Sequence, residues 1–176
     1  FPMRVSLFFF SGKWPDTPGD HYRLFRDAVQ FADRHGFEAV WTPERHFNKF
    51  GGLYPNPALT GAAAAVLTKQ IGIRAGSVVA PIQDPLRIAE EWSVVDNLSQ
   101  GRVGVSFATG WNVNDFALEP KSYESRRDFM YERIEIVRKL WRGESVARRN
   151  GIGAEVNISV FPKPYQREIP IWITAQ

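Results

Sequence analysis

The sequence predicts an α/β fold built on a parallel sheet. Short apolar segments typical of strands alternate with longer amphipathic or Ala-rich segments typical of helices, along most of the 176 residues. Strict alternation of strand and helix places parallel strands side by side with helices outside them. No G-x-G-x-x-G motif follows the first strand, which disfavours a dinucleotide-binding Rossmann fold. Two architectures remain, an open doubly wound sheet and a (β/α)₈ barrel.

Five apolar segments are predicted to be strands. The first, from Met3 to Phe10, is apolar almost throughout, which is typical of a strand buried on both faces. The others are the segments 37–44, 71–79, 102–110 and 169–175. Between the fourth and the fifth, turn residues at Asn150, Gly151 and Gly153 predict a β-hairpin near residues 146–162.

Four helices are predicted between these strands. The first carries apolar residues at helical spacing, and Gly36 supplies its C-terminal cap. Asp84 and Pro85 predict the N-cap and the first position of the third helix. The expected helices are the segments 24–36, 56–69, 84–101 and 122–141.

The composition argues against several classes of function. The absence of cysteine removes disulfides, thiolate catalysis and Cys-ligated metals, and it suits a reducing, cytoplasmic compartment. Three histidines in all, with no Asp/Glu/His trio at ligand spacing, disfavour a metal site. The net charge of +3 is too small to indicate nucleic acid or an anionic membrane as partner. No signal peptide is visible and no apolar run approaches the ~18 residues of a membrane span.

Polar and aromatic residues gather where the predicted strands end. In both remaining architectures, ligands bind at the C-terminal ends of the strands. The second strand runs directly into Glu44, Arg45 and His46, which place an acid, a base and an imidazole side by side. The other strand ends are residues 8–11, 76–81, 108–112 and 174–176. Neither a G-x-S-x-G nucleophile elbow nor a P-loop is present. The sequence therefore disfavours an α/β-hydrolase site and a P-loop nucleotide site.

Four sequence blocks resemble the bacterial luciferase-like flavin monooxygenases, and together they cover nearly the whole chain. They are GFEAVWTPERHF, NPALTGAAAA, VVAPIQDPLRIAEEWSVVDNLSQGR and VGVSFATGWNVNDF. The most specific block is the P-x-x-x-P, helix, D-x-L-S-x-G-R run from Pro81 to Arg102. Within the family, the chain is most similar to the monooxygenase domains embedded in polyketide and nonribosomal peptide synthases.

The resemblance implies a (β/α)₈ TIM barrel, of which residues 1–176 form the N-terminal part of one domain. A whole barrel needs roughly 250 residues, so we expect about three βα units to lie outside this chain. The chain begins with Phe1 rather than Met, which favours a piece of a longer polypeptide. The hairpin near 146–162 is then expected to be an insertion in the barrel.

The resemblance also implies an activity. Reduced FMN, supplied by a partner flavin reductase, and molecular oxygen are expected to act on a natural-product intermediate by oxygen insertion or hydroxylation. The substrate would be a small molecule or a group bound to a carrier protein. A homodimer is compatible with such a monooxygenase. Two alternatives stay open: a deazaflavin (F420)-dependent oxidoreductase of the same fold, and a non-catalytic scaffold domain in a megasynthase.

The family's flavin site can be carried over by position. It would consist of Phe8, Glu44, Gly76, Ser77, Thr109, Gly110 and Gln176. Glu44 would be the flavin-pocket carboxylate and Phe8 the aromatic residue beneath the ring. At Gly76 and Ser77 the family's backbone bulges against the isoalloxazine, often with a non-proline cis peptide. Residues around the FMN phosphate would largely lie beyond Gln176.

The chain departs from the luciferase pattern at two positions. The first histidine of the luciferase Glu-His-His run is Arg45 here, and a cysteine of the fourth strand is Ala108, so the aldehyde chemistry of luciferase is not expected. His46 and Arg45 are the candidate catalytic residues. Because side chains alternate along a strand, Glu44 and His46 are expected to face the flavin and Arg45 to face a neighbouring loop or solvent. Aromatic residues expected to keep the site dry are Phe8, Phe9, Phe10, Phe47 and Trp111.

Overall fold

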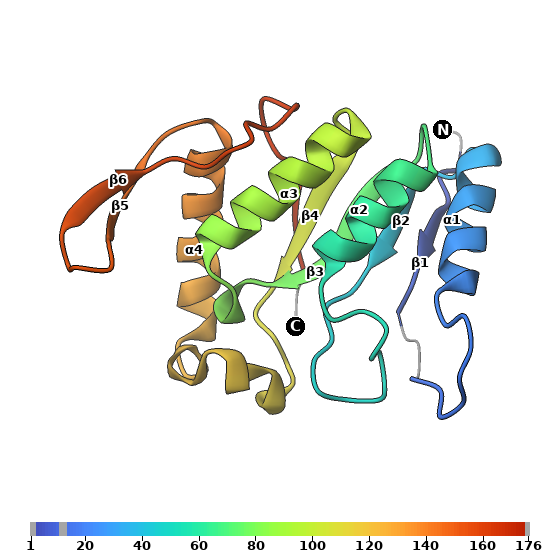
Figure 1. The fold of residues 1–176 in the computed structure, drawn as a ribbon, viewed down its shortest axis with the longest axis horizontal. Coiled ribbons are helices and arrows are strands. Elements are labelled where there is room, and N and C mark those ends of the chain that lie inside the picture. The colour runs from blue at the N-terminus through green and yellow to red at the C-terminus, as the bar shows by residue number, and fades with distance from the viewer. Residues whose placement is uncertain (1–2, 11–13, 175–176) are drawn as a thin grey trace.

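One five-stranded parallel sheet organises the protein (Figure 1). The computed structural model describes residues 3–10 and 14–174. The strands are β1 (Ser6–Phe8), β2 (Ala39–Thr42), β3 (Gly72–Val79), β4 (Val103–Ala108) and β7 (Ile171–Ile173). They pair in the order β1-β2-β3-β4-β7, and every pairing is parallel. This order has no reversal, unlike a doubly wound sheet, and confirms the prediction of consecutive strands of a (β/α)₈ barrel.

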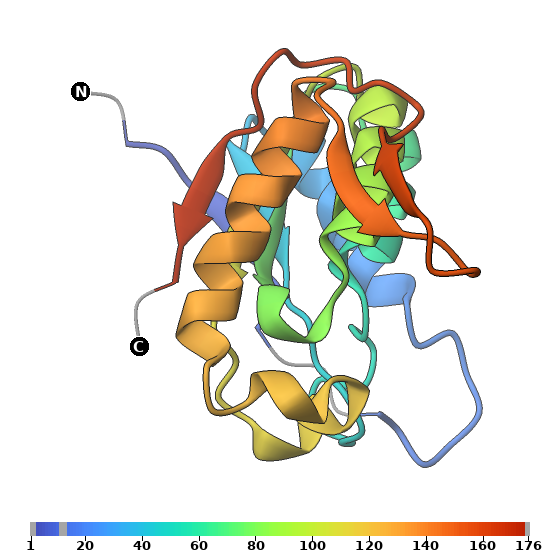
Figure 2. The ribbon, with the colours of Figure 1, turned by 90° about the vertical axis from the view of Figure 1, so that its left-hand side faces the viewer.

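Four α-helices cover one face of this sheet (Figures 1 and 2). They are α1 (Arg23–Arg34), α2 (Pro57–Leu67), α3 (Pro85–Ser99) and α4 (Arg126–Trp141). Three short 3₁₀ helices, η1 (Ala80–Ile82), η2 (Val113–Leu118) and η3 (Pro120–Ser122), follow β3 and β4. Helix α4 begins at Arg126 rather than at the predicted Ser122, because Pro120–Ser122 form a 3₁₀ helix before it. Within the described residues no helix is long and apolar enough to span a membrane.

Local signals set the end of α1 and both ends of α3 as predicted. The Asp84 side chain accepts a hydrogen bond of 2.8 Å from the Leu86 amide, and Pro85 occupies the first helical position of α3. Gly36 follows α1 with a φ of 71°, and Gly101 follows α3 with a φ of 87°. Both values lie in the left-handed region that glycine adopts without steric cost.

The predicted hairpin is present as a separate two-stranded antiparallel sheet. It consists of β5 (Val146–Arg149) and β6 (Glu155–Ile158), and it projects beside α4 (Figure 1). Asn150 closes the turn, because its side-chain oxygen accepts from the amides of Ile152 and Ala154 at 3.1 and 3.0 Å.

The main core lies between the sheet and the helices, where Trp92 and Trp141 are almost completely buried. The prediction that the first strand is buried on both faces is wrong. Phe9 packs into the core, whereas Phe8 and Phe10 on the opposite face are 48% and 60% exposed. The reason is that this inner face lines a cavity, so apolar residues occur on both sides of the strand without a second packed layer.

Arg102 ties the ends of two helices to the start of β4. Its guanidinium donates to the carbonyls of Ala65, Thr68 and Ile71, all within 3.1 Å, and to the carbonyl of Ser99 at 2.8 Å. The carbonyls at a helix C-terminus have no partner inside the helix, and Arg102 supplies partners for those of both α2 and α3.

We expect Arg102→Met to lower the free energy of unfolding by about 2–4 kcal/mol, because it leaves several carbonyls without a donor. Urea unfolding of the full-length protein measures this change. Arg138→Met is the matched control, since Arg138 is exposed and pairs with Glu135 one turn away, and it should cost about 0.5 kcal/mol or less. Equal effects of the two substitutions would contradict the prediction.

Candidate active site

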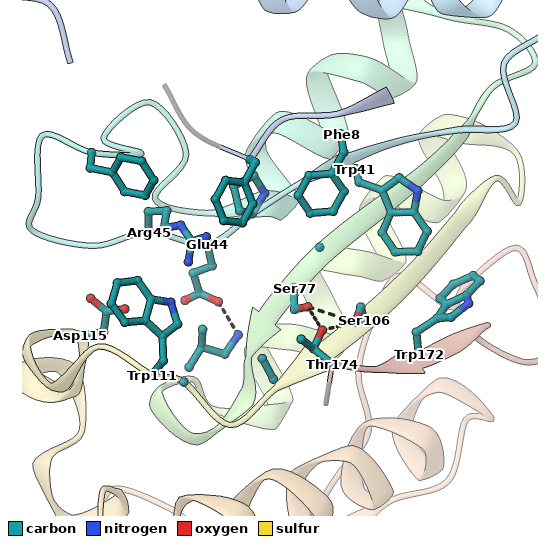
Figure 3. Close-up of a pocket in the computed structure, with 17 residues that line it drawn as sticks. Phe8, Trp41, Glu44, Arg45, Ser77, Ser106, Trp111, Asp115, Trp172 and Thr174 are labelled. Carbon is teal, nitrogen blue, oxygen red and sulfur yellow. Dashed lines mark hydrogen bonds between the residues drawn. The ribbon is translucent and has the colours of Figure 1, made fainter. Parts of the chain in front are cut away.

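A cavity of about 720 Å³ opens at the C-terminal ends of the strands, on the face of the sheet that the helices leave uncovered (Figure 3). This size is within the roughly 300–1,000 Å³ typical of small-molecule sites. Its aromatic lining consists of Phe8, Phe10, Trp41, Phe50, Trp111 and Trp172. Its polar lining consists of Glu44, Arg45, Ser77, Ser106, Asp115 and Thr174. The surface of the cavity is thus mainly apolar and rich in aromatic rings, with polar groups among them, as expected of a small-molecule site.

The floor of the cavity is formed where β3 bulges. The peptide bond between Gly76 and Ser77 is cis, and the register of β3 against β4 shifts between Gly76 and Val78. Both features agree with what the resemblance implied for this position. A Cβ on Gly76 would lie 2.9 Å from the ring of Phe8 and 3.2 Å from the ring of Trp41. Only glycine leaves the floor flat here.

Three hydroxyl groups meet on this floor. Ser77 Oγ lies 3.0 Å from Ser106 Oγ and 2.6 Å from Thr174 Oγ1, and the last two atoms are 2.9 Å apart (Figure 3). They come from β3, β4 and the end of β7. Hydroxyls both donate and accept, so the group can rearrange its hydrogen bonds around a polar ligand edge. The sequence analysis did not single out Ser106, although a serine inside an otherwise apolar strand is a usable signal.

Glu44 joins the loop after β2 to the end of β3. The residue is 2% exposed, and its carboxylate accepts from the Val79 amide and from Gln83 Nε2, both at 2.7 Å. His46 Nε2 lies 2.7 Å from the same carboxylate. A buried carboxylate needs such partners, because it has lost its hydration. Glu44 therefore holds the cavity wall together, besides lining it.

The expected orientations of Arg45 and His46 are wrong. Arg45 lines the cavity, whereas His46 lies behind the wall, against Glu44 and in a small side pocket near Asp115. The alternation argument requires strand geometry, and β2 ends at Thr42. Pro43 follows, and Arg45 N bonds to Tyr54 O at 2.9 Å rather than to a neighbouring strand. The loop therefore sets its own side-chain directions.

The titratable groups of this region influence one another. Burial alone would lower the pKa of His46, but the hydrogen bond to Glu44 and the charges of Glu44 and Asp115 together raise it above its usual value. Burial raises the pKa of Asp115, although His46, Arg45 and a hydrogen bond from Asn112 oppose that shift. Burial also lowers the pKa of Arg45, partly offset by the charge of Asp115.

A pH dependence of stability follows from the raised pKa of His46. The folded protein binds the proton more tightly than the unfolded chain, so the stabilisation is complete below the unfolded pKa of about 6.5. It is lost as the pH rises from there through the folded pKa. Urea midpoints measured across this window should fall for the wild type, and His46→Gln should remove that part of the slope. His21→Gln is the control and should keep it; a slope unchanged in His46→Gln would contradict the assignment.

The remaining predicted site residues do not all line the cavity. Gly110 lines the cavity, and its φ of 84° and the 2.8 Å approach of Val79 to an added Cβ leave no space for a side chain. Thr109 lines a neighbouring cavity of about 420 Å³, which shares Thr174 with the first. Gln176 lies outside the described residues.

Part of the expected aromatic wall lies elsewhere. Phe9 packs in the core against Phe25 and Tyr54, and Phe47 is 68% exposed. Trp41 and Trp172 line the cavity with their ring centroids 5.2 Å apart, and the sequence analysis did not assign them to the site. Nor did it assign Phe50 and Asp115. Among residues 3–10 and 14–174, no cluster of three or more His, Asp or Glu side chains is arranged to hold a metal ion.

Known proteins share this sequence pattern. The oxygenase component of the flavin-dependent trigonelline monooxygenase of Acinetobacter baylyi is 31% identical over 99% of this chain and 49% of its own length. The alkanal monooxygenase alpha chain of Aliivibrio fischeri is 25% identical over 90% of this chain and 46% of its own. The chain thus spans about half the length of these curated relatives.

Solved structures share the fold. The monooxygenase RslO1 from Streptomyces bottropensis superposes with a TM-score of 0.86 and 31% identity, over 97% of this chain and 53% of its own. The oxygenating constituent of 3,6-diketocamphane monooxygenase from Pseudomonas putida, in complex with FMN, superposes with a TM-score of 0.82 over 98% and 51%. At 19% identity, this second likeness shows the fold alone. A model of the luciferase-like monooxygenase family matches residues 3–176, and the chain therefore belongs to that family.

Proposed function

We propose that the protein is the oxygenase component of a two-component flavin-dependent monooxygenase, which uses reduced FMN from a separate flavin reductase together with molecular oxygen. The observation that carries the proposal is the aromatic cavity at the strand ends, with its flat glycine floor at Gly76. The trigonelline relative supports it, because that protein is named the oxygenase component of a flavin-dependent monooxygenase.

The residues of the cavity fit a flavin ring. Gly76 leaves open the space that a Cβ would fill, and Phe8 and Trp41 provide aromatic rings beside it. The hydroxyls of Ser77 and Thr174 are placed to exchange hydrogen bonds with ring carbonyls and nitrogens. Phe8, Glu44, Gly76, Ser77 and Gly110 would hold the cofactor, and Thr109 and Gln176 remain proposed contacts. When bound, reduced FMN supplies the electrons that activate oxygen.

The protein's own residues have three tasks in this proposal. The aromatic lining excludes water from the site, which strengthens every polar interaction inside it. Glu44 fixes the loop that carries Arg45, and His46 acts as a positioning residue through its contact with Glu44. Arg45 places a positive charge in the wall of the cavity. Arg45 is therefore the better placed of the two candidate catalytic residues to touch the reactants.

The proposal includes a natural-product intermediate as substrate, free or bound to a carrier protein, and either oxygen insertion or hydroxylation as the reaction. It also includes a cytoplasmic location and a homodimer. Leu59 and Val66 on α2, each 68% exposed, are apolar surface that a second copy would cover.

Titration of the full-length protein with reduced FMN, oxidised FMN and F420 tests the cofactor assignment. We expect reduced FMN to bind most tightly and FMN fluorescence to be quenched by the cavity's tryptophans. An F420-dependent secondary alcohol dehydrogenase shares the fold at a TM-score of 0.73 and 21% identity. Tighter binding of F420 than of either FMN form would therefore replace the monooxygenase by a hydride-transferring enzyme, and failure to bind any of the three would favour a scaffold domain.

A further inference from the structure

Arg45 is a cation that the proposed cofactor site leaves without a partner. It lies in the cavity wall, and it forms no ion pair with any acidic residue that the structure describes. Its Nε–H is buried and has no hydrogen-bond acceptor in the part of the chain that the structure describes. A buried donor without an acceptor is costly, and native structures rarely keep one without a reason. Nη1 and Nη2 form no hydrogen bond with the described residues either, and unlike Nε they are not fully buried, so they are the donors that a ligand in the cavity can reach.

The direction of the Arg45 side chain is built into the loop. Gly51 packs flat against the aliphatic stem: an added Cβ there would overlap Arg45 Cγ and lie 2.9 Å from Arg45 Cβ. Gly51 has a φ of 73°, a conformation that favours glycine, and Arg45 N bonds to Tyr54 O at 2.9 Å. The stem is thus held in place by the loop between residues 45 and 54 rather than free to swing into solvent.

Two aromatic rings flank the guanidinium. Its central carbon lies 5.3 Å from the ring centroid of Phe10 and 5.7 Å from that of Trp111. Aromatic faces stabilise a cation but accept no strong hydrogen bond, so the N–H groups remain available. Asp115 is the nearby acid (Figure 3), yet its Oδ1 accepts a hydrogen bond of 2.7 Å from Asn112 Nδ2. The site offers a positive charge, partly desolvated, at the edge of an aromatic cavity.

We propose that Arg45 is the substrate-recognition group of the cavity and that it binds the carboxylate of a flat, largely apolar substrate. A guanidinium pairs with a carboxylate through two parallel N–H···O bonds, which satisfies its donors and fixes the ligand's orientation. The neighbouring rings of Phe10, Phe50 and Trp111 suit an aromatic or unsaturated body. Identification of the ligand as the substrate rests on the proposed monooxygenase function, whereas the anion site itself does not.

Benzoate and benzamide are the test ligands, because they share shape and differ in charge. Isothermal titration calorimetry of the full-length protein, free of FMN and near neutral pH, measures both. We expect wild-type protein to bind benzoate at least about 10-fold more tightly than benzamide, the scale of a charge-assisted pair. Arg45→Met should weaken benzoate by about 10- to 100-fold and leave benzamide within about 3-fold, which also shows that the variant is folded. Arg45→Lys should fall between, because it keeps the charge and loses the fork.

Arg87→Met is the matched control, since Arg87 lies exposed on α3 and pairs with Glu90 and Glu91. It should keep the full preference for benzoate. Equal binding of the two ligands by wild type, binding of neither, or a preference retained in Arg45→Met would each overturn the proposal.

A parallel titration with reduced FMN separates the substrate from the cofactor as the anion. Arg45→Met should bind reduced FMN within about 3-fold of wild type, because the lost pair is with the substrate. If FMN affinity instead falls about 10-fold or more while the benzoate preference is unchanged, Arg45 serves the flavin and the proposal fails. Absence of FMN binding with the benzoate preference intact would refute the monooxygenase and leave the anion site standing.

Discussion

Replacing Glu44 by alanine is expected to lower the free energy of unfolding by about 3–5 kcal/mol, one of the largest effects in the chain. The substitution removes the acceptor of the Val79 amide, of Gln83 Nε2 and of His46, all at 2.7 Å and in a region without solvent to replace it. The loop after β2 is then no longer tied to the end of β3. We therefore also expect the variant to lose FMN binding, because Glu44 itself and Gly76 are proposed cofactor contacts on the two segments that the carboxylate connects.

Urea unfolding of the full-length protein measures the loss, and two variants define its origin. Glu135→Ala removes a carboxylate that is exposed on α4, and it should cost about 0.5 kcal/mol or less. Glu44→Gln keeps the shape and one acceptor but turns an amide NH₂ toward existing donors, so it should fall between the two. Glu44→Ala and Glu135→Ala with the same stability would show that the buried hydrogen bonds contribute nothing net.

The end of α1 and the start of α3 were predictable because their signals are local. Asp84 and Pro85 start α3 through contacts within one turn, and Gly36 ends α1 through its own backbone. The bulge at Gly76 was also anticipated, but through family resemblance rather than through any local rule. The two helix ends depend on little beyond their own segments.

The direction of side chains in the site was not predictable in the same way. Whether Arg45 or His46 faces the cavity depends on where β2 stops pairing with β3, and on contacts that the following loop makes within itself, such as the hydrogen bond from Arg45 N to Tyr54 O. Which residues line the cavity was also difficult to predict from the sequence. Phe8 and Trp172 are apolar residues in strands, and a strand pattern does not distinguish a face packed in a core from a face that lines a cavity.

Enlarging Gly76 is expected to weaken cofactor binding strongly, with a modest loss of stability. In Gly76→Ala the new Cβ would lie 2.9 Å from Phe8 Cε2 and 3.2 Å from Trp41 Cε3, and the half-exposed Phe8 ring can move only by entering the cavity. We expect FMN affinity to fall about 10-fold in this variant and about 100-fold or more in Gly76→Val, which adds bulk directly above the floor. The free energy of unfolding should fall by about 1–3 kcal/mol, as is typical of overpacking.

Flavin fluorescence titration and urea unfolding of the same preparations separate the two effects. Gly151→Ala is the matched control, because an added Cβ at that hairpin position meets nothing within 4 Å, and both measurements should match wild type. The expected order of FMN affinity, wild type above Gly76→Ala above Gly76→Val, reflects increasing side-chain volume at one point of the floor. If Gly76→Val remains folded and binds FMN like wild type, the ring does not lie on this floor, and the hydroxyls of Ser77, Ser106 and Thr174 lose their proposed role with it. The cofactor would then have to occupy another part of the cavity, nearer to Arg45 and Trp111.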